Sequence, residues 1–90
     1  MLFMVIEHFK NQDAAPAYSR FQEQGRMLPA GLMYVDSWTE TNFARCFQLM
    51  ECADPALFAE WISYWDDLVE FEILPVISSK EAVNIITPTA

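Results

Sequence analysis

Basic residues are scarce in this sequence. Five lysines and arginines stand against thirteen aspartates and glutamates among 90 residues, which gives a formal net charge of -8 at pH 7. A chain with this charge repels phosphate backbones and anionic membrane surfaces. We therefore expect neither nucleic acid nor a membrane among its partners.

Cysteine and histidine are nearly absent, and Cys46, Cys52 and His8 are the complete set. If the segment between the two cysteines is extended, it spans roughly 20 Å, which is beyond the reach of a disulfide. We expect both cysteines to be reduced thiols in the core of a cytoplasmic protein. Because the sequence holds no Cys-x-x-Cys pair and no Cys/His cluster, we expect no metal site, and no cofactor is expected.

Long apolar runs are also missing. The opening run Leu2–Ile6 is short and follows no basic region, so it does not have the pattern of a signal peptide. No stretch approaches the roughly eighteen consecutive apolar residues of a transmembrane helix.

Large apolar side chains, by contrast, are abundant. Hydrophobic residues make up 53% of the chain, with three Trp, seven Phe, three Tyr and five Met. A chain of this length forms a single domain, which we assign to residues 1–90, and its small core cannot easily hide so much apolar surface. The alternatives are a monomer with an apolar surface and a homodimer that covers the surplus at an interface. We favour the homodimer.

The hydrophobic pattern predicts four strands and two helices. The runs 2–9, 32–39, 43–52 and 69–76 are short, apolar and rich in β-branched and aromatic residues, which is typical of strands. Segments 14–28 and 55–68 have helical periodicity. In the C-terminal tail, 79–90, Ser79 could cap a short helical turn that extends to Val83, and we expect the last residues to be loose.

The second helix has the clearest pattern. Asp54 followed by Pro55 is a typical helix start, since Asp caps the helix and Pro fits its first turn. At about 100° per residue, six apolar side chains share one arc: Leu57, Phe58, Trp61, Ile62, Trp65 and Leu68. In the first helix, Gly25 would either allow close approach to a sheet or end the helix.

The order strand, helix, strand, strand, helix, strand predicts an α+β fold of the ferredoxin-like βαββαβ type. Right-handed crossovers place both helices on one face of a four-stranded antiparallel sheet with strand order 4-1-3-2. The other face is left bare. Since that face carries Met and aromatic residues, something must cover it.

Six segments resemble a family of small bacterial proteins catalogued only as a domain of unknown function. They are residues 1–10, 25–29, 34–38, 45–50, 54–58 and 69–72. The resemblance implies a dimeric α/β barrel, in which two such sheets pack face to face. The wider superfamily includes cofactor-independent monooxygenases, lactone isomerases, haem-binding enzymes, dyp-type peroxidases and ligand-sensing modules, so it does not select a chemistry.

Five residues form the candidate pocket. His8 ends the first strand and is either a general base or haem ligand, or a hydrogen-bonded residue at a strand end. Tyr34, Asp36 and Trp38 alternate, so we expect them on one face of the second strand, lining either a cavity or a solvated edge. Gln48 lies in an apolar stripe between Cys46 and Met50 and needs a hydrogen-bond partner there.

Other acidic residues admit simpler explanations. Glu70 and Glu72 share a strand face and form either an acid–base or metal pair, or an ordinary solvated surface. Asp66 and Asp67 end the second helix, where a cation such as Arg26 or Arg45 could offset their unfavourable interaction with the helix dipole.

Two hypotheses for the function follow. The first is a dimeric small-molecule-binding or interaction module with an apolar pocket. The second is a cofactor-independent enzyme of the monooxygenase or isomerase type. In that enzyme His8 or Asp36 would transfer a proton on an apolar, aromatic or ketone-bearing substrate. Only the superfamily resemblance supports the second hypothesis.

Overall fold

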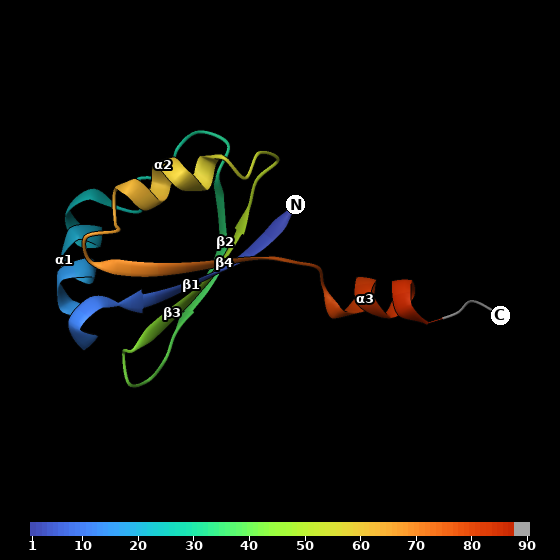
Figure 1. Cartoon of the computed structure of the whole chain (residues 1–90), viewed down its shortest axis with the longest axis horizontal. Helices are drawn as coiled ribbons and strands as arrows, with labels where there is room; N and C mark the ends of the chain where they lie inside the picture. The colour runs from blue at the N-terminus through green and yellow to red at the C-terminus, as the bar shows by residue number, and fades with distance from the viewer. Residues whose placement is uncertain (88–90) are drawn as a thin grey trace.

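A computed structural model describes residues 1–87 as an α+β fold compatible with the ferredoxin-like arrangement (Figure 1). Its strands are β1 (Leu2–Phe9), β2 (Met33–Thr39), β3 (Arg45–Glu51) and β4 (Val69–Val76). They form one antiparallel sheet in the order β2-β3-β1-β4. Its α-helices are α1 (Ala15–Gln24), α2 (Leu57–Ser63) and α3 (Ser79–Ile86), and a 3-10 turn, η1 (Lys10–Gln12), follows β1.

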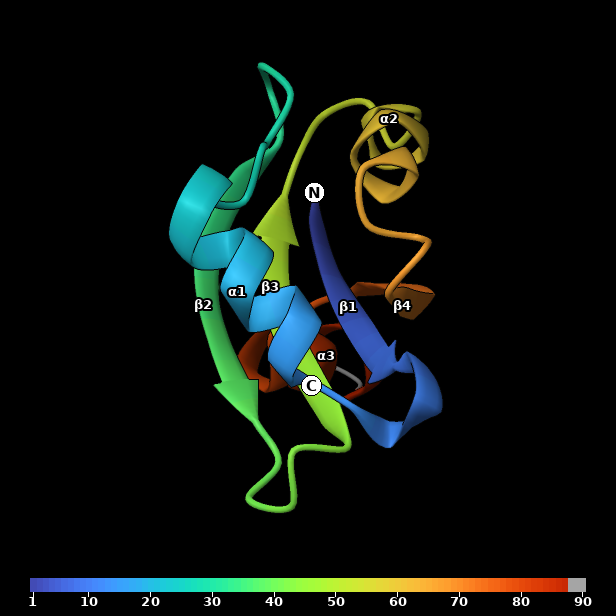
Figure 2. The same ribbon diagram turned by 90° about the vertical axis from the view of Figure 1, so that its left-hand side faces the viewer.

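The sheet has two different faces, which we call the covered face and the open face. Helices α1 and α2 lie on the covered face (Figures 1 and 2). Along β1 burial alternates strictly, because successive side chains of a strand point to opposite sides. The side chains of Phe3, Val5, Glu7 and Phe9 are buried on the covered face, and those of Leu2, Met4, Ile6 and His8 lie half-buried on the open face.

The core lies between α2 and the covered face. Phe58, Trp61 and Trp65 are buried there, and Leu57 and Ile62 pack against the same cluster. Leu68 packs against a second, smaller cluster beneath α1 that includes Ala17 and Val69. The predicted apolar arc of the second helix therefore faces the sheet.

Both helices are shorter than the expected segments 14–28 and 55–68. Helix α1 ends at Gln24 because Gly25 adopts a φ of 68°, which favours glycine and ends a helix. Apart from Gly25 itself and its two chain neighbours, no atom lies within 4 Å of the position that a Cβ would occupy there, so this glycine does not serve close packing. Helix α2 is regular only over Leu57–Ser63, and turns continue the chain to Leu68.

The C-terminal tail contains a helix longer than the predicted turn. Helix α3 begins after Ser78, whose hydroxyl accepts a hydrogen bond from the backbone N–H of Glu81 at 3.1 Å, so Ser78 and not Ser79 is the cap. The helix buries none of its residues and extends away from α1 and α2 (Figure 1). The last residues that we expected to be loose include 88–90, which lie outside the described part of the chain.

Candidate functional site

A pocket of about 100 Å³ opens between α1 and the covered face of the sheet. Helix α1 contributes Ala17, Tyr18 and Phe21, while α2 and the turn after it contribute Trp61 and Trp65. The remaining lining residues come from the three strands β1, β2 and β3 and from the loop after α1: Glu7, Phe9, Arg26, Ser37, Thr39, Cys46 and Gln48.

The floor of the pocket holds a hydrogen-bonded chain of three polar side chains. Glu7 on β1 and Gln48 on β3 are 7% and 6% exposed, and the amide Nε2 of Gln48 donates a hydrogen bond to Oε1 of Glu7. The guanidinium Nε of Arg26 donates to Oε1 of Gln48 at 3.2 Å. Because the arginine can only donate, this contact fixes which end of the Gln48 amide faces Glu7.

Arg26 is held in place by contacts on several sides. Its guanidinium carbon lies 3.6 Å from the ring centre of Tyr34 and 4.9 Å from that of Phe21, so the cation sits over two aromatic rings. Its backbone carbonyl accepts hydrogen bonds from the indole N–H groups of Trp61 at 2.9 Å and Trp65 at 3.1 Å. The loop after α1 is thereby tied to the helix α2 region.

Burial perturbs the two titratable groups next to this chain. Desolvation raises the pKa of Glu7 above its ordinary value, although the amide of Gln48, the charge of Arg26 and the thiol of Cys46 oppose the change. Burial, with the charge of Glu7 adding to it, raises the pKa of the Cys46 thiol to about 11. Cys46 therefore stays protonated at neutral pH. The protonated form of Glu7 is more favoured here than the protonated form of a carboxyl group in water.

The walls of the pocket are mainly aromatic. Tyr18 presents a ring, and its hydroxyl is hydrogen-bonded to Oγ1 of Thr39 at 2.6 Å. The indole N–H groups of Trp61 and Trp65 bind the backbone of Arg26, and these two rings are nearly buried, so Tyr18 and Phe21 offer most of the exposed ring surface to a ligand. The site therefore combines apolar walls with a buried carboxyl group, an arrangement typical of small-molecule sites.

The five predicted pocket residues do not lie together. Gln48 lines the pocket, and the ring of Tyr34 packs against Arg26, which also lines it. The expectation that Tyr34, Asp36 and Trp38 share one face was wrong, because the register of β2 shifts between Tyr34 and Asp36. One extra residue at such a bulge reverses which side of the sheet the following side chains face.

As a result, Tyr34 pairs with Met50 on the covered face, whereas Asp36 pairs with Leu49 and Trp38 with Phe47 on the open face. Asp36 is exposed in the isolated chain, and its Oδ1 accepts a hydrogen bond from the backbone N–H of Ser37 at 2.8 Å.

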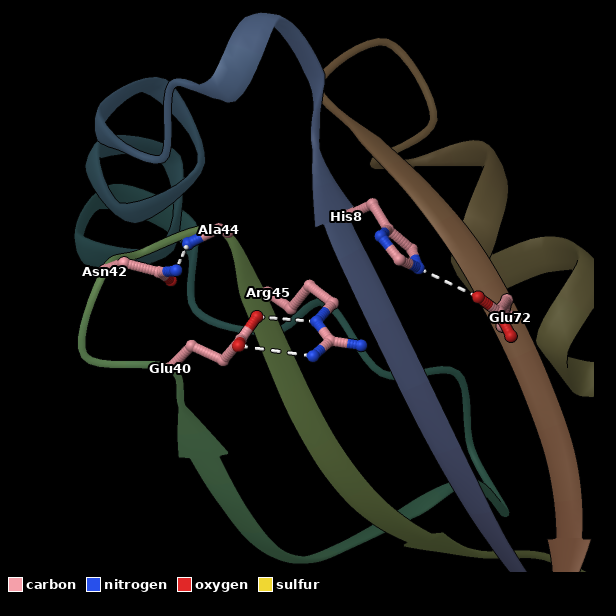
Figure 3. A network of polar contacts seen from close by, with 6 residues as sticks. All are labelled: His8, Glu40, Asn42, Ala44, Arg45 and Glu72. Carbon is pink, nitrogen blue, oxygen red and sulfur yellow. Dashed lines mark hydrogen bonds and ion pairs between the residues drawn. The ribbon is translucent and has the colours of Figure 1, made fainter.

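His8 also lies on the open face, away from the pocket (Figure 3). Its Nε2 is 2.9 Å from Oε1 of Glu72 on β4, which agrees with a hydrogen-bonded residue at a strand end. Nearby, Arg45 donates from Nε at 2.5 Å and from Nη2 at 3.2 Å to the carboxylate of Glu40. Within residues 1–87 no group of three or more His, Cys, Asp or Glu side chains is placed to hold a metal ion.

Asp66 and Asp67 lie in the turns after α2 and not at its end, and the cation beside Asp67 is a different one from those expected. Arg20 of α1 binds both carboxylate oxygens of Asp67 at 2.8 Å, and it holds the pKa of that carboxyl group below its ordinary value. Arg26 and Arg45, the two candidates from the sequence, pair with Gln48 and Glu40 instead.

Glu7 and Arg26 were not among the predicted site residues. Glu7 could have been found, because its spacing from Phe3, Val5 and Phe9 places it in the apolar stripe of its strand. Arg26 carries no such signal, since it acts from an irregular loop whose course depends on the positive φ of Gly25 and Met27.

Comparison with known families gives one match. The family described as a domain of unknown function (DUF3303) matches residues 1–90. No curated protein and no solved structure matches the chain. Among the described residues no helix has both the length and the apolar character needed to cross a membrane.

Proposed function

We propose that this chain, which belongs to the DUF3303 family of domains of unknown function over its whole length, is a homodimeric protein that binds a small molecule in the pocket beneath α1. The observation that carries the proposal is the chain from Arg26 through Gln48 to Glu7 on the floor of an open, ring-lined pocket.

This polar chain is costly for a fold that only needs a core. Removing a carboxyl group and an amide from water is unfavourable unless both are fully hydrogen-bonded, and apolar side chains of the same volume are often at least as stable. Glu7 and Gln48 nevertheless occupy neighbouring central strands where the residues two positions away on either side, which share their face of the sheet, are apolar. Stability alone does not account for these two polar residues, whereas recognition of a polar group on a ligand does.

The second part of the proposal concerns the open face. Its centre carries Met4, Ile6, Phe47 and Leu49, and its edges carry the exposed Met33, Trp38 and Leu74. The same face carries Glu70 and Glu72 on β4. Apolar side chains gathered in this way support an interface with another molecule. We propose that a second copy covers it, as in a dimeric α/β barrel, which places His8, Asp36 and Trp38 at the interface between subunits.

Ligand binding can be tested through the pocket's own tryptophans. Trp61 and Trp65 line the pocket, so a bound ring compound should change their fluorescence. A Trp38→Phe variant removes the tryptophan of the open face and serves as the background for the screen. Chemical-shift changes confined to Glu7, Gln48 and α1 in nuclear magnetic resonance (NMR) spectra support the proposal, whereas changes confined to the open face contradict it.

The dimer can be tested by light scattering coupled to gel filtration. The proposal requires a mass of twice the 10.4 kDa of one chain at micromolar concentration. A mass near 10.4 kDa at every concentration would rule out the paired open faces, but it would leave the pocket of the single chain intact.

A second candidate function is a cofactor-independent enzyme of the monooxygenase or isomerase type. The raised pKa of Glu7 favours it, because a general base works best when its pKa approaches the operating pH. In this version Glu7 replaces His8 and Asp36 as the proton-transferring residue. Exchange of the α-protons of cyclohexanone in D₂O, followed by NMR, would be accelerated by the protein and not by its Glu7→Gln variant.

A further inference from the structure

We infer that the pocket takes an uncharged ring compound with a carbonyl oxygen, and that the neutral carboxyl group of Glu7 donates a hydrogen bond to that oxygen. This inference rests on the proposed ligand-binding function and specifies its ligand class.

The direction of the hydrogen bonds along the floor leads to this assignment. Nε of Arg26 donates to the oxygen of Gln48, so the nitrogen of Gln48 must be the atom that donates to Oε1 of Glu7. Oε1 of Glu7 thus has a donor already, so a proton on Glu7 belongs on Oε2; the thiol of Cys46 is the other hydrogen-bond partner of this carboxyl group. A protonated carboxyl group on the pocket floor presents one O–H donor to a ligand.

The charged and titratable groups around Glu7 come from several elements. Arg26 approaches from the loop after α1, and Cys46 lies opposite Glu7 on β3. Helix α1 contributes Tyr18, whose hydroxyl is hydrogen-bonded to Thr39. From β4 the opposing residue is Phe71, and α2 contributes indole rings. Desolvation raises the pKa of Glu7 and outweighs the amide of Gln48, the charge of Arg26 and the thiol of Cys46, which all favour the ionised form.

The walls determine the rest of the ligand. Phe9, Tyr18, Phe21, Trp61 and Trp65 present ring surfaces, and a charged group placed among them would lose its hydration without a full set of partners. The volume of about 100 Å³ is somewhat smaller than the roughly 150 Å³ engineered cavity that binds benzene. A six-membered ring is therefore too large to be enclosed, and it would lie with its carbonyl at the floor and its far side in the open mouth.

Cyclohexanone and methylcyclohexane are suitable probes, because they share a six-membered ring and a methyl group in the second replaces the acceptor oxygen of the first. Binding is measured by NMR titration of ¹⁵N-labelled protein, and the side-chain amide signal of Gln48 reports on the floor directly. We expect cyclohexanone to bind about three- to tenfold more weakly at pH 8 than at pH 4.5, since one net hydrogen bond is lost when Glu7 ionises. Methylcyclohexane should show no such change.

A Glu7→Gln variant separates this inference from the function on which it rests. The amide of Gln donates at every pH, so the variant should bind cyclohexanone with no pH dependence. His8→Gln and Glu72→Gln, on the open face, should keep the dependence of the natural protein and exclude the pair His8–Glu72 as its source.

The outcomes are distinct. If neither probe perturbs the pocket, the ligand-binding function itself is wrong. If both bind but the affinity for cyclohexanone is equal at the two pH values, or its pH dependence persists in Glu7→Gln, the pocket stands and the assignment to Glu7 is overturned.

Discussion

The side-chain amide of Gln48 donates a hydrogen bond to the carboxyl group of Glu7 across the two central strands. Both side chains lie beneath helix α1, on the covered face of the sheet, among large apolar residues. This contact joins the stability of the fold to the protonation of one residue, because the carboxyl group has to lose its hydration before the helices can pack over it.

The first prediction concerns the pH dependence of stability. The pKa of Glu7 is raised in the folded state, so ionisation of Glu7 opposes folding. Below the unfolded-state pKa, Glu7→Gln should match the natural protein. As pH rises from that value through the folded-state pKa, the natural protein loses stability that the variant keeps. Urea unfolding at pH 4 and pH 8, followed by circular dichroism, measures the difference.

Glu72→Gln is the matched control, since Glu72 lies next to His8 on the open face, on the other side of the sheet from the pocket. It should not reproduce the pH-dependent gain of Glu7→Gln. An equal gain in both variants would show that net charge, and not the buried site, controls stability.

The second prediction concerns the middle residue of the polar chain. Gln48→Met keeps the length of the side chain but removes the donor to Glu7 and the acceptor for Arg26. Leaving buried polar groups unpaired should lower the free energy of unfolding by about 1–3 kcal/mol. A Glu7→Met/Gln48→Met double variant should recover part of this loss, because apolar groups replace both partners. If the double variant loses the sum of the two single effects, the residues are not coupled.

The strands and the buried arc of α2 could be predicted from the sequence because their signals are local. Alternation along β1 and the spacing of Phe58, Trp61 and Trp65 reflect which side chains the sheet and helix must bury. The expected ranges 2–9 and 69–76 coincide with β1 and β4 for the same reason. Pro75 has no backbone N–H to donate to a neighbouring strand, and it lies on β4, which is an outer strand of the sheet.

The site could be predicted only in part, because its geometry depends on irregular backbone. The register shift in β2 moves Asp36 and Trp38 to the face opposite Tyr34. The alternating sequence pattern does not predict this shift. Arg26 reaches Gln48 from a loop whose path no periodicity encodes. Gln48 itself was found because a lone amide in an apolar stripe has to be satisfied by a partner.

The third prediction concerns the cysteines. Burial raises the pKa of Cys46 to about 11, and burial also raises that of Cys52. The thiolate is the reactive form, so neither residue should react quickly with a thiol reagent at pH 8 in the folded protein. Both should react at once in denaturant. Single Cys→Ala variants identify each signal by mass spectrometry. Rapid labelling of Cys46 in the native protein would mean that the pocket floor is open to solvent.

The fourth prediction tests the core between α2 and the sheet. Trp61 is 1% exposed, packs edge-on against Phe71 at 5.4 Å between ring centres, and donates its N–H to Arg26. Trp61→Ala should lower the free energy of unfolding by about 3–5 kcal/mol. Denaturant unfolding provides the measurement, and a loss below about 1 kcal/mol would be incompatible with a buried position.

The fifth prediction tests the open face. Trp38 is 52% exposed in the single chain and lies opposite Phe47, so the fold of one subunit loses little when it is replaced. If a second copy covers this face, Trp38→Ser removes a large aromatic contact from the interface, and such residues often dominate binding energy. We expect dissociation to a mass near 10.4 kDa at concentrations where the natural protein is dimeric, with an unchanged circular dichroism spectrum.

Tyr64→Ser is the control, because Tyr64 has a similar exposure of 42% but follows α2 on the other side of the molecule. Equal effects of the two substitutions, or a dimer that survives Trp38→Ser at every concentration, would show that subunits do not meet through this face.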